Sequence, residues 1–259
     1  MKSLPPIFKK WAARLALALG AATASAGVMA AGGGALPYSY EADVDNLPSV
    51  QRGAKYYMAY CSGCHSMQFM RYSRIASDLE IPEQMLQDNL MFTGGNIGDT
   101  IASAMPAEKG EDWFGQRPPD LTLETRARGE DWVYSYLKSF YIDPARPMGV
   151  NNLVLAGASM PHVLWEQQGW QVLASHDEES EEGEHDGHGH ADPFISVQKG
   201  ALSPEEYDKF VSDLVNFMAY AAEPGRSDRQ ALGVKVLVYL FVLLGFAYLL
   251  KKEYWRDIH

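Results

Sequence analysis

Apolar residues form long runs at the two ends of the chain, and a mixed pattern of polar and apolar positions fills the stretch between them. Residues 231–250 are apolar apart from Lys235, and about 20 such residues suffice for a helix to cross a bilayer. Basic and aromatic residues follow, namely Lys251, Lys252, Tyr254, Trp255 and Arg256. Such residues are typical of a cytoplasmic flank. The pattern predicts one transmembrane helix over residues 229–250 and a cytoplasmic tail over residues 251–259.

Residues 1–30 have the pattern of an export signal. Basic residues at positions 2, 9, 10 and 14 precede a stretch of small and apolar residues, and no acidic residue occurs before Glu41. The tripeptide at 28–30 has the small-x-small form that signal peptidase cleaves. A first transmembrane helix is the alternative, but the apolar stretch at 15–29 is shorter than the roughly 20 residues that a span needs. We therefore expect a signal peptide over residues 1–30 and a periplasmic domain over residues 31–228.

Between the two ends, apolar positions recur mainly with the spacing of α-helices. Three segments have this pattern: residues 49–60, 128–141 and 203–217. In the second, aromatic residues recur every four positions at Trp132, Tyr136 and Phe140. The third begins with Ser203, whose place before a proline and two acids is typical of a helix N-cap. Because alternating strand patterns are scarce, we predict a mostly α-helical domain with long irregular loops where Gly and Pro cluster.

The charge is strongly acidic, with a formal net charge of −11 and a pI near 5.1. Nucleic-acid binding requires basic stripes that this sequence lacks, so a cationic partner is the better match. An insertion over residues 176–192 holds eight acids, four His and three Gly, a composition typical of a solvated segment. It could steer a basic partner, bind a transition metal through its imidazoles or only solubilise the domain. The sequence leaves these three roles open.

The only two cysteines lie in the segment Cys61-Ser62-Gly63-Cys64-His65, which has the spacing of a c-type haem attachment motif. Two sulfurs at this spacing reach the two vinyl groups at one porphyrin edge, and the adjacent His becomes an axial ligand of the iron. A thioredoxin-like redox pair or a structural disulfide would also use two cysteines. Neither of these alternatives needs His65, so the motif favours one covalently attached haem c.

A second axial ligand must come from elsewhere in the chain, and methionine is the usual choice in electron-transfer c-type haems. Met105 and Met160 are each followed by a proline, which stiffens an extended backbone. The small residues at 157–159 would let the chain approach the haem closely, which favours Met160. Spacing alone does not exclude Met105, and His162 is a third candidate.

Further motifs follow the Cys-x-x-Cys-His segment in a characteristic order. They are Ser66-Met67 with Arg71-Tyr72, Pro118–Leu121, Trp132–Leu137, Tyr141 with Asp143-Pro144, Gly149–Asn152 and Met160-Pro161, before the C-terminal membrane helix. In this combination the sequence resembles cytochrome c1 of the bacterial cytochrome bc1 complex over roughly residues 37–256.

The resemblance implies a ligand set and a set of partners. Family members carry the axial Met after the Pro-Pro-Asp-Leu stretch, so it implies His65 and Met160 as iron ligands, and Met105 drops out. It also implies Arg117 beside a haem propionate, where a guanidinium pairs bidentately with a carboxylate. The partners would be cytochrome b, a Rieske iron-sulfur protein and an acceptor cytochrome c. The location would be the inner membrane, with the haem domain on the periplasmic side.

The function that follows is electron transfer within quinol:cytochrome c oxidoreductase, with no bond-making chemistry in the isolated chain. A free-standing membrane-tethered shuttle or oxidase subunit is the first alternative. A haem enzyme or gas sensor with an open distal site is the second, and a haem-free thiol protein is the third.

Overall fold

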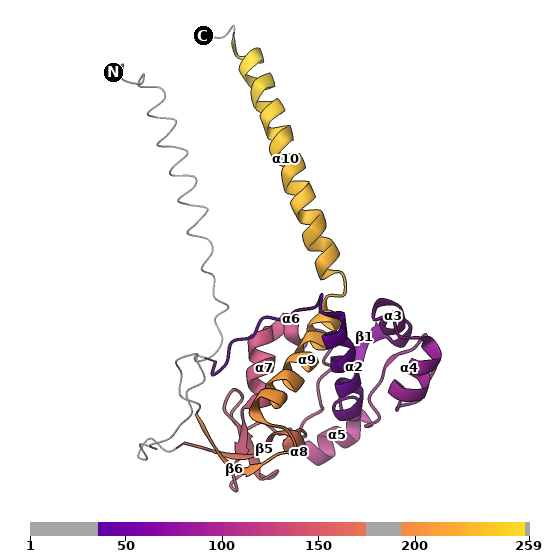
Figure 1. Cartoon of the computed structure of the whole chain (residues 1–259), viewed down its shortest axis with the longest axis vertical. Helices are drawn as coiled ribbons and strands as arrows, with labels where there is room; N and C mark the ends of the chain where they lie inside the picture. Colours follow the sequence, from indigo (N-terminus) through magenta and orange to yellow (C-terminus); the bar gives the residue numbers. More distant parts are fainter. Residues whose placement is uncertain (1–35, 175–192, 257–259) are drawn as a thin grey trace, which may run out of the picture. The chain divides into compact units, whose positions relative to one another are not determined.

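The computed structural model describes residues 36–174 and 193–256. The signal peptide expected over residues 1–30 and the insertion expected over residues 176–192 lie outside these ranges, as does the end of the tail. Helices make up most of the regular structure (Figure 1). They are α2 (Leu47–Tyr60), α3 (Tyr72–Asp78), α4 (Glu83–Leu90), α5 (Ala107–Phe114), α6 (Glu124–Arg128), α7 (Glu130–Lys138), α8 (Trp165–Gln168), α9 (Pro204–Ala222) and α10 (Arg226–Tyr254).

The strands of the described ranges form three small antiparallel pairs. They are β1 (Met67–Arg71) with β2 (Thr100–Ile101), β3 (Phe140–Ile142) with β4 (Val150–Asn152), and β5 (Gly169–Leu173) with β6 (Phe194–Lys199). Long irregular connections join most of these elements. The predicted fold class, mostly α-helical with long irregular loops and a C-terminal membrane helix, is confirmed.

The core forms where α2 packs against α9, two helices that lie side by side in Figure 1. Buried residues of α2 such as Tyr57 face Leu214 and Phe217 of α9, all within one hydrophobic cluster. Gly53 permits the close approach, since a Cβ at this position would lie 1.9 Å from the carbonyl oxygen of Asp213. The last turn of α2 leads directly into the Cys-x-x-Cys-His segment, so this packing fixes the base of the motif.

A buried polar network also joins α2 to α9. The Asp213 carboxylate is 3% exposed and accepts hydrogen bonds from Ser49 Oγ at 2.5 Å and from Arg52 Nε at 2.6 Å. Asn216 donates to Ser49 Oγ at 2.8 Å and accepts from Tyr40 Oη at 2.7 Å. A buried charge needs this degree of pairing, because an unpaired carboxylate in the interior is strongly destabilising.

The helix predicted over residues 128–141 is shorter in the structure. Gly129 has a φ of +102° and separates α6 from α7, which then ends at Lys138. Phe140 pairs with Asn152 in the β3–β4 ladder, so strand hydrogen bonds satisfy its backbone. The four-residue spacing of aromatic residues therefore continues past the end of the helix. By contrast, α9 begins at Ser203 with the expected capping box, and Ser203 Oγ accepts from the backbone N–H of Glu206.

The C-terminal helix α10 has the length and composition of a membrane span. Its most apolar window has a mean hydropathy of 2.2, and none of that window is buried against the rest of the chain. It begins three residues before the predicted start at 229 and continues through Tyr254. Arg226, in its first turn, pairs with Glu130 at the start of α7.

Candidate haem site

The Cys-x-x-Cys-His segment forms a tight turn at the C-terminal end of α2. Cys61 is the C-cap of the helix, and its carbonyl accepts hydrogen bonds from the backbone N–H of Cys64 at 3.0 Å and of His65 at 2.8 Å. Tyr57, fully buried one turn earlier, donates its hydroxyl to the carbonyl of His65 at 3.0 Å. These bonds hold the two sulfurs and the imidazole in one compact loop.

Cys61 and Cys64 are not joined in a disulfide, and both side chains lie where burial disfavours the thiolate. Burial raises the pKa of Cys61 to about 12, and the neighbouring Cys64 adds to the shift. Burial also raises the pKa of Cys64. A redox pair of the thioredoxin type needs a thiol whose pKa is lowered toward neutrality, since the thiolate is the nucleophile. The environment of Cys61 has the opposite effect, which counts against that alternative.

His65 is buried and held in one tautomer. Its Nδ1 lies 2.8 Å from the carbonyl oxygen of Pro119. A carbonyl can only accept, so Nδ1 carries the proton and Nε2 keeps its lone pair. Burial lowers the pKa of His65, while the Pro119 carbonyl and the carboxylates of Asp120 and Glu124 oppose the shift. A neutral imidazole whose Nδ1–H is bound to a backbone carbonyl is the usual form of a metal-ligating histidine.

The loop that supplies the Pro119 carbonyl is pinned to the strand after His65 by Asp120. One carboxylate oxygen of Asp120 accepts from Ser66 Oγ at 2.8 Å and from the backbone N–H of Gln68 at 2.7 Å. The other accepts from the N–H and hydroxyl of Thr122 at 3.0 and 2.6 Å. Partial burial alone would raise the pKa of Asp120, but these hydrogen bonds outweigh it and the pKa is lowered.

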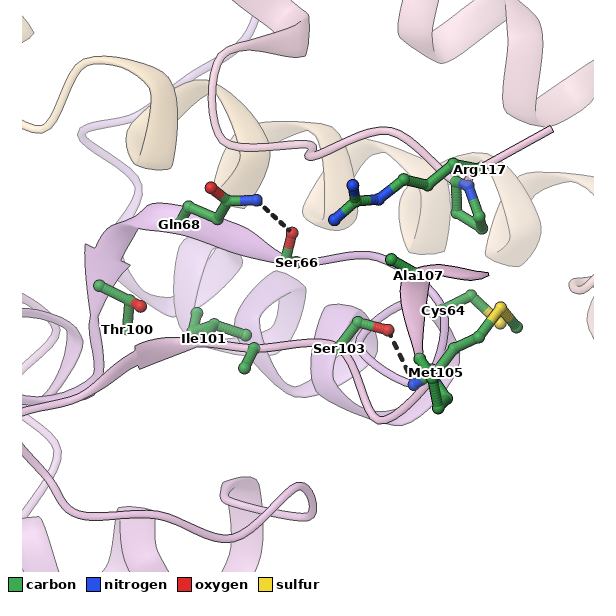
Figure 2. A pocket seen from close by; sticks show the side chains of 12 residues that line it. Cys64, Ser66, Gln68, Thr100, Ile101, Ser103, Met105, Ala107 and Arg117 are labelled. Carbon is green, nitrogen blue, oxygen red and sulfur yellow. Dashed lines mark hydrogen bonds between the residues drawn. The ribbon is translucent and has the colours of Figure 1, made fainter. Parts of the chain in front are cut away.

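Arg117 and Met105 line a cavity of about 290 Å³ beside Cys64. Figure 2 shows the Arg117 side chain extending across this cavity toward Ser66. Met105 is tied to the motif through its backbone, whose N–H donates to the carbonyl of Gly63 at 3.0 Å. The structure thus places two residues singled out in the sequence next to one attachment cysteine. The role of Arg117 at a propionate stays a prediction.

Met160 lies on the connection between β4 and α8 and is half-buried. Leu164, four residues on, is 1% exposed and belongs to the same core cluster as Tyr57 and Cys61. Gln167 of α8 donates to the hydroxyl of Tyr60, the last residue of α2, at 2.9 Å. The segment that carries Met160 therefore packs against the end of α2 from which the haem motif begins.

The sulfur of Met160 has a hydrogen-bond partner on α7. The hydroxyl of Tyr136 donates to Met160 Sδ at 3.6 Å. Burial raises the pKa of Tyr136 to about 12, with Arg128 lowering it and Glu124 raising it. The Glu124 carboxylate also acts on the pKa of His65. The Glu124 carboxylate thus acts electrostatically on both His65 and the tyrosine that contacts Met160.

His162 packs among aromatic rings. Its ring stacks on Phe140 with centroids 5.2 Å apart and meets Trp170 edge-on at 5.8 Å. Burial lowers its pKa to about 4, against the opposing effects of Gly169 and Gln168. Its Nε2 is buried without a hydrogen-bond partner. His162 is therefore part of the aromatic packing around Phe140 and Trp170.

Tyr136, Asp120 and Arg128 are site residues that the sequence reasoning missed. Arg128 pairs with Glu124 and lies 4.3 Å from the centroid of the Trp132 ring, which stacks on Tyr136. The recurrence of aromatic residues every four positions is the available signal in the sequence, but on its own it predicts only a helix. No local pattern reports a contact to a methionine 24 residues away.

The residues present fit a haem group. Two cysteines that form no disulfide lie one turn of chain apart, a buried neutral histidine follows them, and the Met160 thioether lies on another segment. Nitrogen and thioether are the donor pair of c-type electron-transfer haems. Within residues 36–174 and 193–256, no group of three or more His, Cys, Asp or Glu side chains is arranged so that it could hold a metal ion.

Fold and site together define a helical domain that carries a Cys-x-x-Cys-His motif and ends in a candidate membrane helix. The model of the cytochrome c1 family matches residues 42–181 and 195–258. The chain belongs to the cytochrome c1 family. Proteins of this family are the electron-transfer haem subunits of cytochrome bc1 complexes, which makes this chain a haem protein of a membrane-bound electron-transport system.

Three relatives show how far the similarity extends. Cytochrome c1 of Allochromatium vinosum is 48% identical over 95% of this chain and 99% of that protein. The ammonia monooxygenase gamma subunit of Nitrosomonas europaea is 46% identical over 82% of this chain and 84% of that protein. Cytochrome b/c1 of Bradyrhizobium diazoefficiens is 25% identical over 82% of this chain and 33% of that protein.

Proposed function

We propose that the chain is the electron-exit subunit of a quinol:cytochrome c oxidoreductase. It would take one electron at a time from a Rieske iron-sulfur protein and pass it to a soluble or tethered cytochrome c. The observation that carries the proposal is the 2.8 Å contact between His65 Nδ1 and the Pro119 carbonyl, directly beside the two cysteines of the attachment motif. This contact leaves Nε2 as a metal ligand at the position that the attachment motif requires.

In this proposal each site residue has one task. Cys61 and Cys64 would tether the cofactor through thioether bonds, and His65 and Met160 would hold its iron. Arg117 would pair with a propionate. A bound haem c supplies a one-electron Fe(III)/Fe(II) couple. If His65 and Met160 both hold the iron, no substrate would bind to it, so the isolated chain would carry electrons without making or breaking substrate bonds.

The membrane arrangement follows from the two apolar ends of the chain. A signal peptide over residues 1–30 would export the domain of residues 31–228 to the periplasm. A span over residues 229–250 would leave residues 251–259 in the cytoplasm, on the side that basic flanks prefer. The length and hydropathy of α10 support the span.

Cytochrome b is the proposed partner within the membrane. The relative from Bradyrhizobium diazoefficiens is named cytochrome b/c1, and this chain matches one third of its length. This name supports an association with cytochrome b, for which the exposed apolar surface of α10 is available.

Purification of the full-length protein in mild detergent tests this function. We expect a haem stain on the chain after denaturing electrophoresis and a b-type cytochrome in stoichiometric amount. A lone haem protein would contradict the complex and support a free-standing shuttle. Co-purification with monooxygenase subunits instead would favour the role suggested by the name of the Nitrosomonas relative. Absence of covalent haem on the chain would reject all three.

A further inference from the structure

The hydroxyl of Tyr136 is aimed at the proposed iron ligand. It donates a hydrogen bond to Met160 Sδ across a distance of 3.6 Å between oxygen and sulfur. A thioether sulfur carries two lone pairs and is a weak acceptor. It can therefore bind a metal through one lone pair and accept a hydrogen bond through the other. The hydrogen bond from Tyr136 is therefore compatible with iron binding by Met160, and it acts on the sulfur that would bind the iron.

Aromatic packing fixes the direction of this hydroxyl. The Tyr136 ring stacks on Trp132, with centroids 5.1 Å apart and planes 8° from parallel. Phe140 meets the Tyr136 ring edge-on, with centroids 5.1 Å apart. The Arg128 guanidinium covers Trp132 and pairs with Glu124. Contacts with Trp132 on the same helix and with Phe140 on the strand that follows restrict the rotation of the Tyr136 ring.

The loop that carries Met160 is held to the same element. Asn152 is fully buried and donates Nδ2 to the backbone carbonyl of Tyr136 at 2.8 Å. Its Oδ1 accepts from the backbone N–H of Val154 at 2.9 Å and of Leu155 at 3.1 Å. A single amide therefore links the backbone of α7 to the start of the loop that leads to Met160. The hydroxyl and the sulfur are positioned by one connected set of bonds.

We infer that Tyr136 is a positioning residue for the redox centre: it orients Met160 and withdraws electron density from its sulfur. This inference rests on the proposed function, in which Met160 binds the iron. A sulfur that shares its density with a hydrogen-bond donor is a poorer electron donor to the iron. Ferric iron loses more from a weaker donor than ferrous iron does, so the hydrogen bond raises the reduction potential.

The test is a redox titration of the full-length haem protein carrying Tyr136→Phe. The substitution keeps the ring and its stacking and removes only the hydroxyl. We expect the ratio of reduced to oxidised haem at fixed poise to fall three- to tenfold, the size of one ordinary hydrogen bond. For one electron this is a decrease of roughly 30 to 60 mV, since about 59 mV corresponds to a tenfold change. The near-infrared sulfur-to-iron band of the ferric protein should shift while remaining present.

Tyr141→Phe is the matched control. This tyrosine lies on β3, and its ring contacts Phe194 with centroids 6.4 Å apart. Removing its hydroxyl should leave both the potential and the near-infrared band as in the unsubstituted protein. Replacing Tyr136 by 3-fluorotyrosine provides a second variant, because the more acidic phenol is a stronger donor and should raise the potential. Opposite shifts for the two Tyr136 variants would not arise from a purely structural role.

Two methionine variants separate failure of this inference from failure of the ligand assignment. Met160→Leu should abolish the near-infrared band, and Met105→Leu should leave it intact. If Met160→Leu retains the band, the assignment of Met160 is wrong. If Met160→Leu abolishes the band but Tyr136→Phe changes neither band nor potential, the ligand stands and the role of Tyr136 is overturned. A Tyr136→Phe protein that only unfolds more readily also overturns it.

Discussion

At the scale of single residues, Asp120 organises more of the site than its partial burial suggests. Its two oxygens hold the loop of the Pro119 carbonyl against the strand that follows His65. That carbonyl in turn selects the tautomer of His65. Asp120 thus acts through the Pro119 carbonyl on which imidazole nitrogen of His65 is available to a metal.

Asp120→Asn is expected to lower the free energy of unfolding by about 2 kcal/mol, because an amide keeps one acceptor oxygen and hydrogen bonds to charged groups contribute roughly 1.5–3 kcal/mol each. The pKa of Asp120 is lowered in the folded protein. Its stabilising effect is therefore fully present above the usual Asp pKa of about 3.9 and is lost as the pH falls through the folded-state value. The difference between the two proteins should shrink in acid.

Urea unfolding of the full-length protein in detergent, at neutral and at acidic pH, measures this difference. Asp88→Asn serves as the control, since Asp88 is exposed and receives a single side-chain bond from Gln84. A change within about 0.5 kcal/mol is expected there. Equal midpoints for Asp120→Asn and the unsubstituted protein at neutral pH would contradict the role of Asp120.

The residues that the sequence could predict are those whose chemistry is local. Cys61, Cys64 and His65 lie within one short segment, so their spacing alone predicts haem attachment. Asp120 and Tyr136 act through contacts across 54 and 24 residues of chain, and those contacts exist only after the helices have packed. Met160 is an intermediate case. Spacing alone does not exclude Met105 as the second iron ligand, and the family resemblance selects Met160.

At the scale of elements, the fold depends on how closely α2 approaches α9. Helix ends signalled by local chemistry, such as Ser203 before α9, were predictable. The end of α7 at Lys138 was not, because Phe140 joins β3 through pairing with a strand ten residues further on. Hydrophobic periodicity predicts which side of an element is buried. The change from helix to strand after Lys138 depends instead on the pairing of β3 with β4.

Gly53→Ala tests the close approach of the two helices. The added Cβ would lie 1.9 Å from the carbonyl oxygen of Asp213 and 2.7 Å from Phe217 Cβ, so α2 and α9 must separate. We expect the free energy of unfolding to fall by about 1–3 kcal/mol or more, the cost of an overpacked core. Helix propensity alone predicts the opposite sign, because Ala is favoured over Gly by roughly 1 kcal/mol in a helix.

Gly98→Ala is the matched control, since a Cβ there meets nothing within 4 Å. Chemical denaturation of both variants, followed by circular dichroism, gives the comparison. Stabilisation by Gly53→Ala would show that the helices tolerate a wider separation than the structure indicates.

At the scale of the whole molecule, negative charge is concentrated in one part of the sequence. Residues 147–198 contain nine acids and no Lys or Arg, and most of these acids lie in the insertion of residues 176–192. The strands on either side of it are paired, with the backbone N–H of Ala174 donating to the Pro193 carbonyl at 2.9 Å. The insertion therefore connects two adjacent strand ends, and shortening it need not disturb the β5–β6 pair.

Deletion of residues 177–191 removes seven acids and no basic residue and leaves a short loop of the length that hairpins commonly use. If the insertion steers a basic cytochrome c, the association rate at low salt should fall roughly tenfold, within the range attributed to electrostatic steering. The dependence of the rate on ionic strength should also flatten, because fewer charges remain for salt to screen. Stopped-flow oxidation of the reduced full-length protein by a basic cytochrome c measures both quantities.

A second variant separates charge from length. Replacing the acids of 177–191 by Asn and Gln keeps every residue position and removes the same seven charges. Under steering, this variant should reproduce both the slower association and the flatter salt dependence of the deletion, because long-range attraction depends on charge and not on chain length. If both variants associate at the original rate at every salt concentration, the insertion contributes solubility, and the acceptor must recognise another part of the domain.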